Sequence, residues 1–253
     1  MNKVMRGCIA CALMLIPTGV WAMHPLEVED TGTEGKGNFL LEITGDYVQD
    51  NDLKSTKTTA VIAVGMGEHT DIALELPYLK LDPSPVTGVF ASGKGDLRFK
   101  LKHQIFENEV KQSMAFQIYG DLPTGDHLKG LGTNNVIWGA TLIDTQECND
   151  NAFHANIGYE VFGRDLKKGK LSDNYAILFG LAAEHKLTPS FRFLSELSGE
   201  RRQEGETVSA PFTFLAGVVY DIFPSWYIDL GARAGLNKYA EDYAILAGTA
   251  WRF

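Results

Sequence analysis

The feature of this sequence that most constrains its fold is a repeated alternation of apolar and polar residues, in runs of about ten residues. A period of two is typical of β-strands whose two faces meet different surroundings. After residue 22, helical spacing is not sustained anywhere, and no run approaches the roughly 18 apolar residues of a membrane-spanning helix. The chain is therefore predicted to be all-β. The clearest apolar face belongs to the last run and consists of Tyr243, Ile245, Ala247, Thr249, Trp251 and Phe253.

Runs of this kind predict twelve strands. They cover residues 38–49, 56–66, 70–80, 95–106, 110–120, 134–144, 151–162, 173–186, 190–200, 211–222, 225–236 and 243–253. An even number of antiparallel strands can close into one barrel with both chain ends on the same side. Closure pairs every backbone N–H and C=O group and leaves no exposed strand edge. We therefore predict a single closed antiparallel β-barrel over residues 38–253.

A soluble β-sandwich would also alternate, so aromatic positions and loop lengths decide between the two folds. Aromatic residues such as Tyr47, Phe212 and Trp226 lie near strand ends, as in the interfacial girdles of membrane barrels. The pattern favours a transmembrane barrel with short periplasmic turns and long extracellular loops. Long or polar connections are expected at 50–55, 81–94, 121–133, 163–172, 201–210 and 237–242, and short ones at 107–109, 187–189, 223–225 and 145–150, the last being the longest of the four.

Composition excludes other classes of protein. A mean hydropathy of −0.09 argues against a helical protein with several membrane spans. The 14 Phe, 9 Tyr and 4 Trp supply too much apolar material for a disordered chain. A formal charge of −9 argues against nucleic acid as a partner. The averages do not argue against a membrane barrel, because its lipid-facing and lumen-facing residues alternate and cancel.

The N-terminus has the pattern of a Sec signal peptide over residues 1–22. Lys3 and Arg6 precede an apolar core at 8–16, and a small-residue cleavage site follows at 20–22. Export to the bacterial outer membrane is therefore expected. Of the three cysteines only Cys148 would remain, so no internal disulfide is expected and barrel closure must hold the exported chain together.

Residues 23–37 form a polar leader without a strand pattern, and we expect it on the periplasmic side. Its acidic side chains could fold back into the barrel and plug the lumen by pairing with a basic stripe on one strand. The acidic residues are Glu27, Glu29, Asp30 and Glu34, and the stripe is Arg98, Lys100 and Lys102.

If the aromatic-bearing face of each strand meets lipid, the opposite face lines a lumen that carries both signs of charge. Such a lumen can brace the wall, select solutes, or do both. Small lumen residues such as Gly158, Gly180, Gly231, Gly235 and Gly248 would leave space inside. The predicted lumen-lining residues are Glu42, Thr44, Asp46, Asp71, Glu75, Arg98, Lys100, Lys102, Gln104, Gln117, His154, Asn156, Glu160, Glu184, Lys186, Arg192, Glu196, Asp229, Arg233 and Arg252.

Catalytic and metal-binding patterns are weak. The six histidines have no metal-ligand spacing, so neither a metal nor another cofactor is predicted. His103 and His185 fall on the lipid face, where some barrels carry a lipid hydrolase site, but neither has an obvious serine partner. We do not expect an enzyme.

Two short segments carry a family resemblance. His24-Pro25-Leu26, then Asp30-Thr31 and Gly35-Lys36-Gly37, resemble the opening of the outer-membrane barrels named for the MetA pathway of phenol degradation. Leu122-Pro123-Thr124-Gly125-Asp126, before a long loop, is similar to the same proteins. The resemblance implies a transporter or channel. The terminal Phe253, with Trp251 two residues before it, resembles the signature that the barrel-assembly machinery reads.

The function predicted first is therefore an outer-membrane channel or transporter for small solutes, hydrophobic or aromatic ones among them. A structural or surface-interaction barrel with a plugged lumen is the alternative, and an outer-membrane lipid hydrolase is the third interpretation. The expected partners are outer-membrane lipid, the barrel-assembly machinery and a small solute of unknown identity.

Overall fold

The computed structural model describes residues 24–162 and 174–253. The predicted signal peptide and the whole of the predicted loop at 163–172 lie outside these residues. The elements are β1 (Phe39–Asp50), β2 (Leu53–Gly67), β3 (Thr70–Asp82), β4 (Ala91–Lys94), β5 (Leu97–Glu107), β6 (Gln112–Leu122), the 3-10 turn η1 (His127–Lys129), β7 (Ile137–Cys148), β8 (Asn151–Val161), β9 (Tyr175–Thr188), β10 (Phe191–Glu204), β11 (Thr207–Ser209), β12 (Phe212–Phe223), β13 (Trp226–Gly235) and β14 (Tyr243–Arg252).

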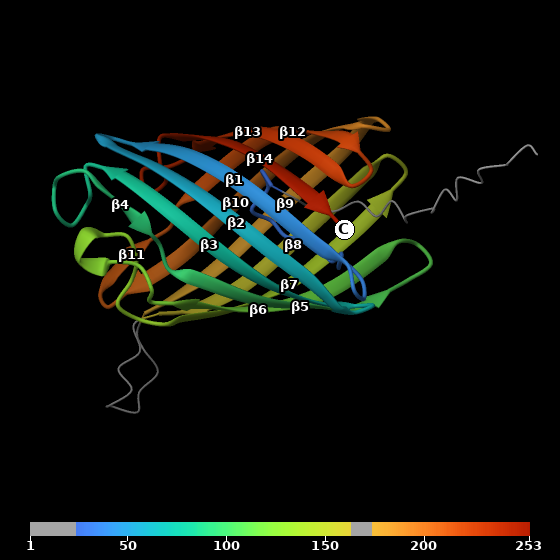
Figure 1. The fold of residues 1–253 in the computed structure, drawn as a ribbon, viewed down its shortest axis with the longest axis horizontal. Coiled ribbons are helices and arrows are strands. Elements are labelled where there is room, and N and C mark those ends of the chain that lie inside the picture. The colour runs from blue at the N-terminus through green and yellow to red at the C-terminus, as the bar shows by residue number, and fades with distance from the viewer. Residues whose placement is uncertain (1–23, 163–173) are drawn as a thin grey trace, which may run out of the picture.

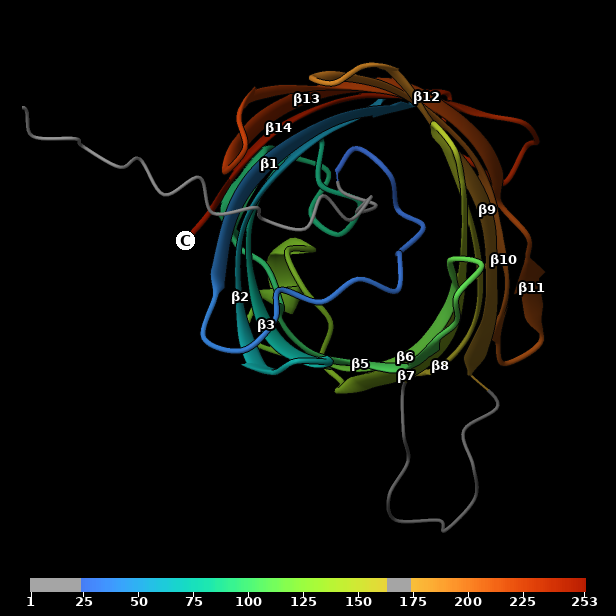
Figure 2. The ribbon, with the colours of Figure 1, turned by 90° about the vertical axis from the view of Figure 1, so that its right-hand side faces the viewer.

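Twelve of these strands close into one antiparallel barrel, as predicted (Figures 1 and 2). Each long strand pairs with its neighbour in sequence, and β1 pairs with β14 from Leu40 opposite Arg252 to Gln49 opposite Tyr243. The short strands β4 and β11 add to the edges of β3 and β10 beyond the barrel. Within the described residues, no helix has the length and apolar character needed to span a bilayer.

The two faces of the wall follow the sequence alternation. Large apolar side chains such as Ile157, Leu181 and Leu230 point outward and are more than half exposed. Charged side chains such as Glu184 and Glu196 are buried on the inner face. Because successive residues of a strand point to opposite faces, one local pattern produces both the lipid-compatible exterior and the polar interior.

Connections at one end of the barrel are short. The turns between long strands there are 68–69, 108–111, 149–150, 189–190 and 224–225. We call this the short-turn end, and the opposite end, which carries loops such as 123–136 and 236–242, the long-loop end. The C-terminus lies at the short-turn end, where Phe253 and Phe39 exchange backbone hydrogen bonds of 2.9 and 3.0 Å (Figure 1).

Three predicted connections were wrong in length. The expected loop at 50–55 is a two-residue turn at 51–52, in which Asn51 adopts a left-handed conformation. Most of 201–210 is strand, because β10 continues to Glu204 and pairs with β11. The connection at 145–150 shrinks to 149–150 because β7 runs on to Cys148. Polar residues at the end of a long strand can continue its ladder outside the membrane, so polarity alone overestimated these loops.

Candidate functional site: the leader inside the lumen

The leader, residues 24–38, lies inside the barrel (Figure 2). It enters at the short-turn end, where the N–H of Gly37 donates to the carbonyl of Gly65 at 2.9 Å. From there the chain passes the inner faces of β5–β8, then β10, and finally β12–β14 and β1. We divide it into a proximal segment, residues 29–34, and a distal segment, residues 24–28, because the two contact the wall in different ways.

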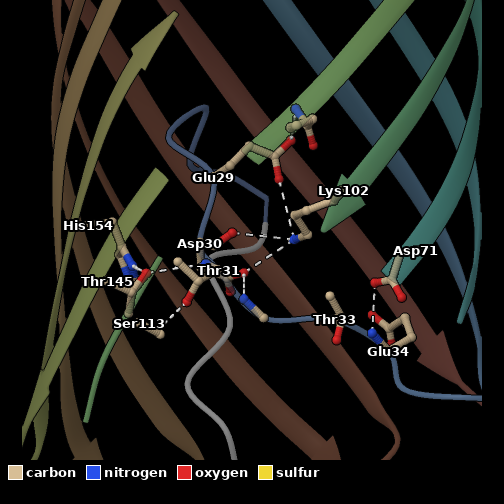
Figure 3. Close-up of polar contacts among 12 residues, drawn as sticks. Glu29, Asp30, Thr31, Thr33, Glu34, Asp71, Lys102, Ser113, Thr145 and His154 are labelled. Atoms are coloured by element: carbon tan, nitrogen blue, oxygen red, sulfur yellow. Dashed lines mark hydrogen bonds and ion pairs between the residues drawn. The ribbon is translucent and has the colours of Figure 1, made fainter. Parts of the chain in front are cut away.

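Charge holds the proximal segment against the basic stripe of β5 (Figure 3). Lys100 Nζ lies 2.9 Å from Glu29 Oε1, and Lys102 Nζ lies 3.4 Å from Asp30 Oδ1. Burial by itself raises the pKa of the Glu29 carboxyl, but Lys100 and Lys102 outweigh it and lower the pKa to about 2. The Glu29 carboxylate therefore stays ionised at neutral pH. Arg98, the third member of the stripe, binds Asp121 of the wall instead.

The backbone of the proximal segment has no neighbouring strand to pair with. Side chains of the wall hydrogen-bond its N–H and C=O groups instead. Asn156 accepts from the N–H of Glu29 and donates to its carbonyl, both at 2.8 Å. Asp71 Oδ2 accepts from the N–H of Glu34 at 2.7 Å (Figure 3). At the same end, Arg252 Nε lies 3.4 Å from Glu34 Oε2. A leader held by side chains can dissociate without disturbing the backbone ladder of the barrel.

A buried polar network on β6–β9 receives Thr31. The Thr31 N–H donates to Thr145 Oγ1 at 3.2 Å, and its hydroxyl lies 2.5 Å from Ser113 Oγ (Figure 3). Thr145 Oγ1 in turn lies 2.9 Å from His154 Nδ1, and His154 Nε2 lies 3.3 Å from Glu184 Oε1. His154 and Glu184 are almost fully buried, so they position Thr145 and do not face a solute.

Shape holds the distal segment. Pro25 packs into a gap between two glycines of neighbouring strands, because a Cβ at Gly217 or Gly231 would lie 2.7 or 2.8 Å from its ring. Val28 occupies the corresponding space above Gly180. The space that the small lumen residues were expected to leave empty is therefore filled here by the leader. Leu26 and Val28 also join a buried apolar cluster that includes Leu194, Leu215, Val219, Tyr227 and Leu246.

Acidic wall residues bind the distal segment as well. Glu196 Oε2 accepts from the N–H groups of Glu27 and Val28 at 2.7 and 2.9 Å. Arg233 binds the Glu27 carboxylate. These backbone N–H groups supply partial positive charge to the Glu196 carboxylate, which forms no ion pair with a cation of the described residues.

His24 joins the leader to two strands that are far apart in sequence. Its Nδ1 lies 2.5 Å from Asp229 Oδ1 on β13, and its Nε2 lies 3.2 Å from Asp46 Oδ1 on β1. Burial lowers the pKa of His24, but the hydrogen bonds and charges of Asp229 and Asp46 raise it overall, to about 9. At neutral pH the imidazole is therefore a cation between two carboxylates. The Asp229 side chain is fully buried beneath it.

Two cavities remain beside the leader. One, of about 320 Å³, lies between Arg98, Tyr119 and Arg233 and opens toward the long-loop end. The other, of about 440 Å³, lies between the leader and the wall of β1–β5. Both contain charged residues of each sign, and both are bounded by Glu27 and Glu29. The leader thus divides the lumen without filling it.

Most of the other predicted lumen residues contact the wall, and of these only Gln117 also contacts the leader in the described residues. Gln104 is displaced from the lumen to the rim, where its Oε1 lies 3.0 Å from His69 Nδ1 of an exposed turn. Gln117 Nε2 donates weakly to Glu29 at 3.4 Å. The remaining wall pairs are Glu42 with Tyr227, Glu75 with Lys100, Glu160 with Tyr119 and Arg202, and Arg192 with Glu184 and Asp221.

Sequence reasoning missed several residues of the site. Asp121 was assigned to a loop. It is in fact the last inward-facing residue of β6, and its carboxylate binds Arg98 at 2.6 Å. Tyr119 was passed over as an aromatic residue, although it shares the inward parity of Gln117. The apolar wall under Leu26 was also missed. Leu194 and Leu215 sit on the lumen face of their strands, and that exception to the alternation was the available signal.

The motif Leu122-Pro123-Thr124-Gly125-Asp126 builds a folded loop at the long-loop end. Asp96 anchors this loop by accepting from the N–H groups of Gly125 at 2.8 Å and Thr133 at 2.6 Å. A Cβ at Gly125 would clash with the carbonyl of Leu131, which explains the glycine. Asp126 pairs with Lys129 at 3.1 Å. The motif therefore shapes a loop and does not reach the leader.

The structure gives little support to a lipid hydrolase site or a metal site. His103 Nδ1 lies 2.8 Å from Thr70 Oγ1, and His185 Nδ1 lies 2.9 Å from Asn151 Oδ1, so neither histidine contacts a serine. In the described parts of the chain, no group of three or more His, Cys, Asp or Glu side chains could hold a metal ion. At the C-terminus, Trp251 stacks on Trp226 with ring centroids 5.8 Å apart, and Phe253 is exposed.

Comparison with known proteins places the fold. A family model described as "Putative MetA-pathway of phenol degradation" matches residues 34–253. The chain is similar to an outer membrane channel from Pseudomonas putida F1, with a TM-score of 0.72 and 13% identity over 90% of this chain and 100% of that chain. It is also similar to the NanC porin (TM-score 0.61, 10% identity, 83% of this chain and 98% of that chain). The beta domain of the Bordetella autotransporter BrkA matches too (TM-score 0.56, 12% identity, 86% and 100%). No curated protein matches the sequence.

Proposed function

The chain belongs to the family described as the MetA-pathway of phenol degradation, and from that premise we propose that it is an outer-membrane channel for small solutes, gated by its own leader. In this proposal the short-turn end faces the periplasm and the long-loop end faces the medium. The outward apolar band meets lipid, and solutes pass along the lumen where the leader lies.

One observation carries the proposal. The leader is held by ion pairs and side-chain hydrogen bonds, and none of its described residues from 24 to 34 adds a strand to the wall. The side chains of the Lys100–Glu29 pair are 19% and 28% exposed, so water and salt reach this contact. Such a segment can leave the lumen while all twelve strands stay paired, which is the behaviour a gate requires.

The size of the remaining space supports small solutes. An apolar cavity of about 150 Å³ is sufficient to bind benzene, and the lumen cavities are about 320 and 440 Å³. A single aromatic ring would therefore fit beside the docked leader. The mixed charge of the lining favours solutes that carry a polar group over plain hydrocarbons.

A permanently plugged structural barrel is the second candidate, and the burial of the proximal segment favours it. Asp30 and Thr31 are 1% and 3% exposed, which is typical of a permanent core. Conductance separates the two candidates. We expect deletion of residues 24–36 to raise single-channel conductance in planar bilayers, and Lys100→Glu together with Lys102→Glu to do the same.

The control for this experiment is Lys129→Glu, which reverses an exposed charge in a loop at the long-loop end that pairs with Asp126 at 3.1 Å. Folding of each variant is checked by heat-modifiable mobility in gel electrophoresis. If the deletion leaves conductance at zero across salt concentrations, the wall itself closes the lumen and the plugged-barrel candidate takes first place.

A further inference from the structure

A basic cluster lies on the outer face of the barrel at the long-loop end. It consists of Lys54 of β2, Lys80 of β3 and Lys94 of β4, and all three are exposed. None of them forms an ion pair or a side-chain hydrogen bond with any described residue. The chain as a whole carries a formal charge of −9, so a local excess of positive charge needs a separate explanation.

Strand register brings the three lysines together. It makes Lys80 the diagonal neighbour of Lys54 on one side and of Lys94 on the other. Diagonal neighbours on one face of an antiparallel pair have Cβ atoms about 7–8 Å apart, within reach of long side chains. One acid, Asp82, lies directly opposite Lys54, which leaves an excess of positive charge in the cluster. Their ammonium groups can therefore converge on one anionic group.

The cluster begins where the apolar band ends. Tyr78 lies directly opposite Lys94, and the preceding outward residue of β3, Leu76, is 40% exposed. Next along the same face is Leu74, which pairs with Ile62 on one side and Phe99 on the other. A tyrosine between apolar and charged residues is typical of the membrane–water boundary. The lysines therefore stand at headgroup depth, directly beyond a surface suited to acyl chains.

The neighbouring strands β6–β9 differ at this level. On their described outer faces, the residues toward the long-loop end are apolar or aromatic, without a lysine or arginine. They are Leu122, Trp138, Tyr159 and Tyr175. On β10, Arg201 is exposed on the outer face, but it is a single cation and donates to the Tyr175 hydroxyl at 3.0 Å. The three lysines therefore form a separate cluster and are not part of a continuous basic ring.

We propose that the basic cluster binds the phosphorylated headgroup of a lipopolysaccharide molecule in the outer leaflet. Its phosphates would accept hydrogen bonds from the lysine ammonium groups, and its acyl chains would lie along the apolar band under Tyr78. The inference goes beyond the proposed channel function and rests only on the same orientation in the membrane. It assigns a fixed lipid partner to one side of the wall.

The test uses the full mature protein purified in detergent and titrated with bisphosphorylated lipid A, with bound lipid counted by native mass spectrometry. The variant is Lys54→Gln, Lys80→Gln and Lys94→Gln combined. The matched control changes three exposed lysines elsewhere, Lys111→Gln, Lys129→Gln and Lys238→Gln. At low ionic strength the variant should bind lipid A roughly 100-fold more weakly than the wild type, and the control should bind normally.

Further arms identify the source of the phosphate. Lipid A stripped of both phosphates should bind the wild type and the variant equally weakly. Equal affinity of the variant and the wild type for intact lipid A would overturn the proposal, and so would wild-type binding to phosphatidylglycerol as tight as to lipid A. Conductance in bilayers free of lipopolysaccharide should not differ between the variant and the wild type, so failure of this proposal is distinguishable from failure of the channel proposal.

Discussion

The proximal and distal segments of the leader occupy the same lumen but are held by different forces. Residues 29–34 lie against the basic stripe and hydrogen-bonding side chains, whereas residues 24–28 add to the ion pairs of His24 and Glu27 a steric fit above glycines and an apolar part of the wall. Charge pairs are screened by salt, and steric fit is not. The same short peptide therefore combines a salt-sensitive contact with a salt-insensitive one, and each can be altered separately.

The largest effect is expected from closing the glycine gap. Gly231→Leu places a side chain where the Pro25 ring now packs, and overpacking of this kind typically costs about 1–3 kcal/mol. We expect the distal segment to leave the wall and conductance to approach that of the deletion variant at every salt concentration. Ala232→Leu, on the outer face of the same strand, is the control. Wild-type conductance in Gly231→Leu would show that shape does not hold the distal segment.

A smaller and salt-dependent effect is expected at the basic stripe. Lys100→Gln with Lys102→Gln removes the cations that contact Glu29 and Asp30. Conductance should rise several-fold in dilute salt, and the difference from the wild type should narrow toward about 1 M salt, where the Debye length is about 3 Å. A difference of the same size at every salt concentration would contradict a screened contact.

The two segments should respond to pH in opposite directions. The raised pKa of His24, about 9, means that its contribution to docking is complete below the ordinary value of 6.5 and is lost as pH rises through about 9. The lowered pKa of Glu29, about 2, means that its contribution is complete above 4.5 and is lost only as pH falls through about 2. Between about pH 5 and pH 6.5 conductance should therefore be flat, and above about pH 6.5 the His24 contribution should fall progressively.

The measurement is conductance from about pH 5 to pH 10 in the wild type and in His24→Gln. In the wild type we expect conductance to stay flat up to about pH 6.5 and to rise from there to about pH 9. In His24→Gln the baseline should be higher and the alkaline increase absent. An alkaline increase of equal size in the variant would assign it to another group.

The smallest effect is expected at Thr31. Thr31→Val removes the hydroxyl that lies 2.5 Å from Ser113, and one hydrogen bond of this kind is worth about 1 kcal/mol. Hydrogen exchange of the leader amides should become about fivefold faster. Thr87→Val, in a loop at the opposite end of the barrel, should leave the exchange unchanged. Unchanged exchange in Thr31→Val would mean that the buried network does not contribute to docking.

Much of the fold followed from local sequence, and much of the site did not. The faces of residues such as Tyr243 and Asp229 were predictable, because parity along a strand is set by its own neighbours. The pairing of the acidic leader with Lys100 and Lys102 was predictable from charge alone. The positions of Asp121 and Gln104 were not, because strand ends depend on the register with the neighbouring strand.

The sequence by itself determined the strands, their two faces and the closed barrel. The alternation of apolar and polar residues sets the strands and their faces, and the even number of alternating runs allows closure. Only the tertiary structure decided that Pro25 fits between Gly217 and Gly231 and that His24 joins Asp46 to Asp229. His24 and Asp229, for example, are 205 positions apart. Their partners are chosen by the register around the whole closed barrel, which is the sum of all its strand pairs and is present in no single segment.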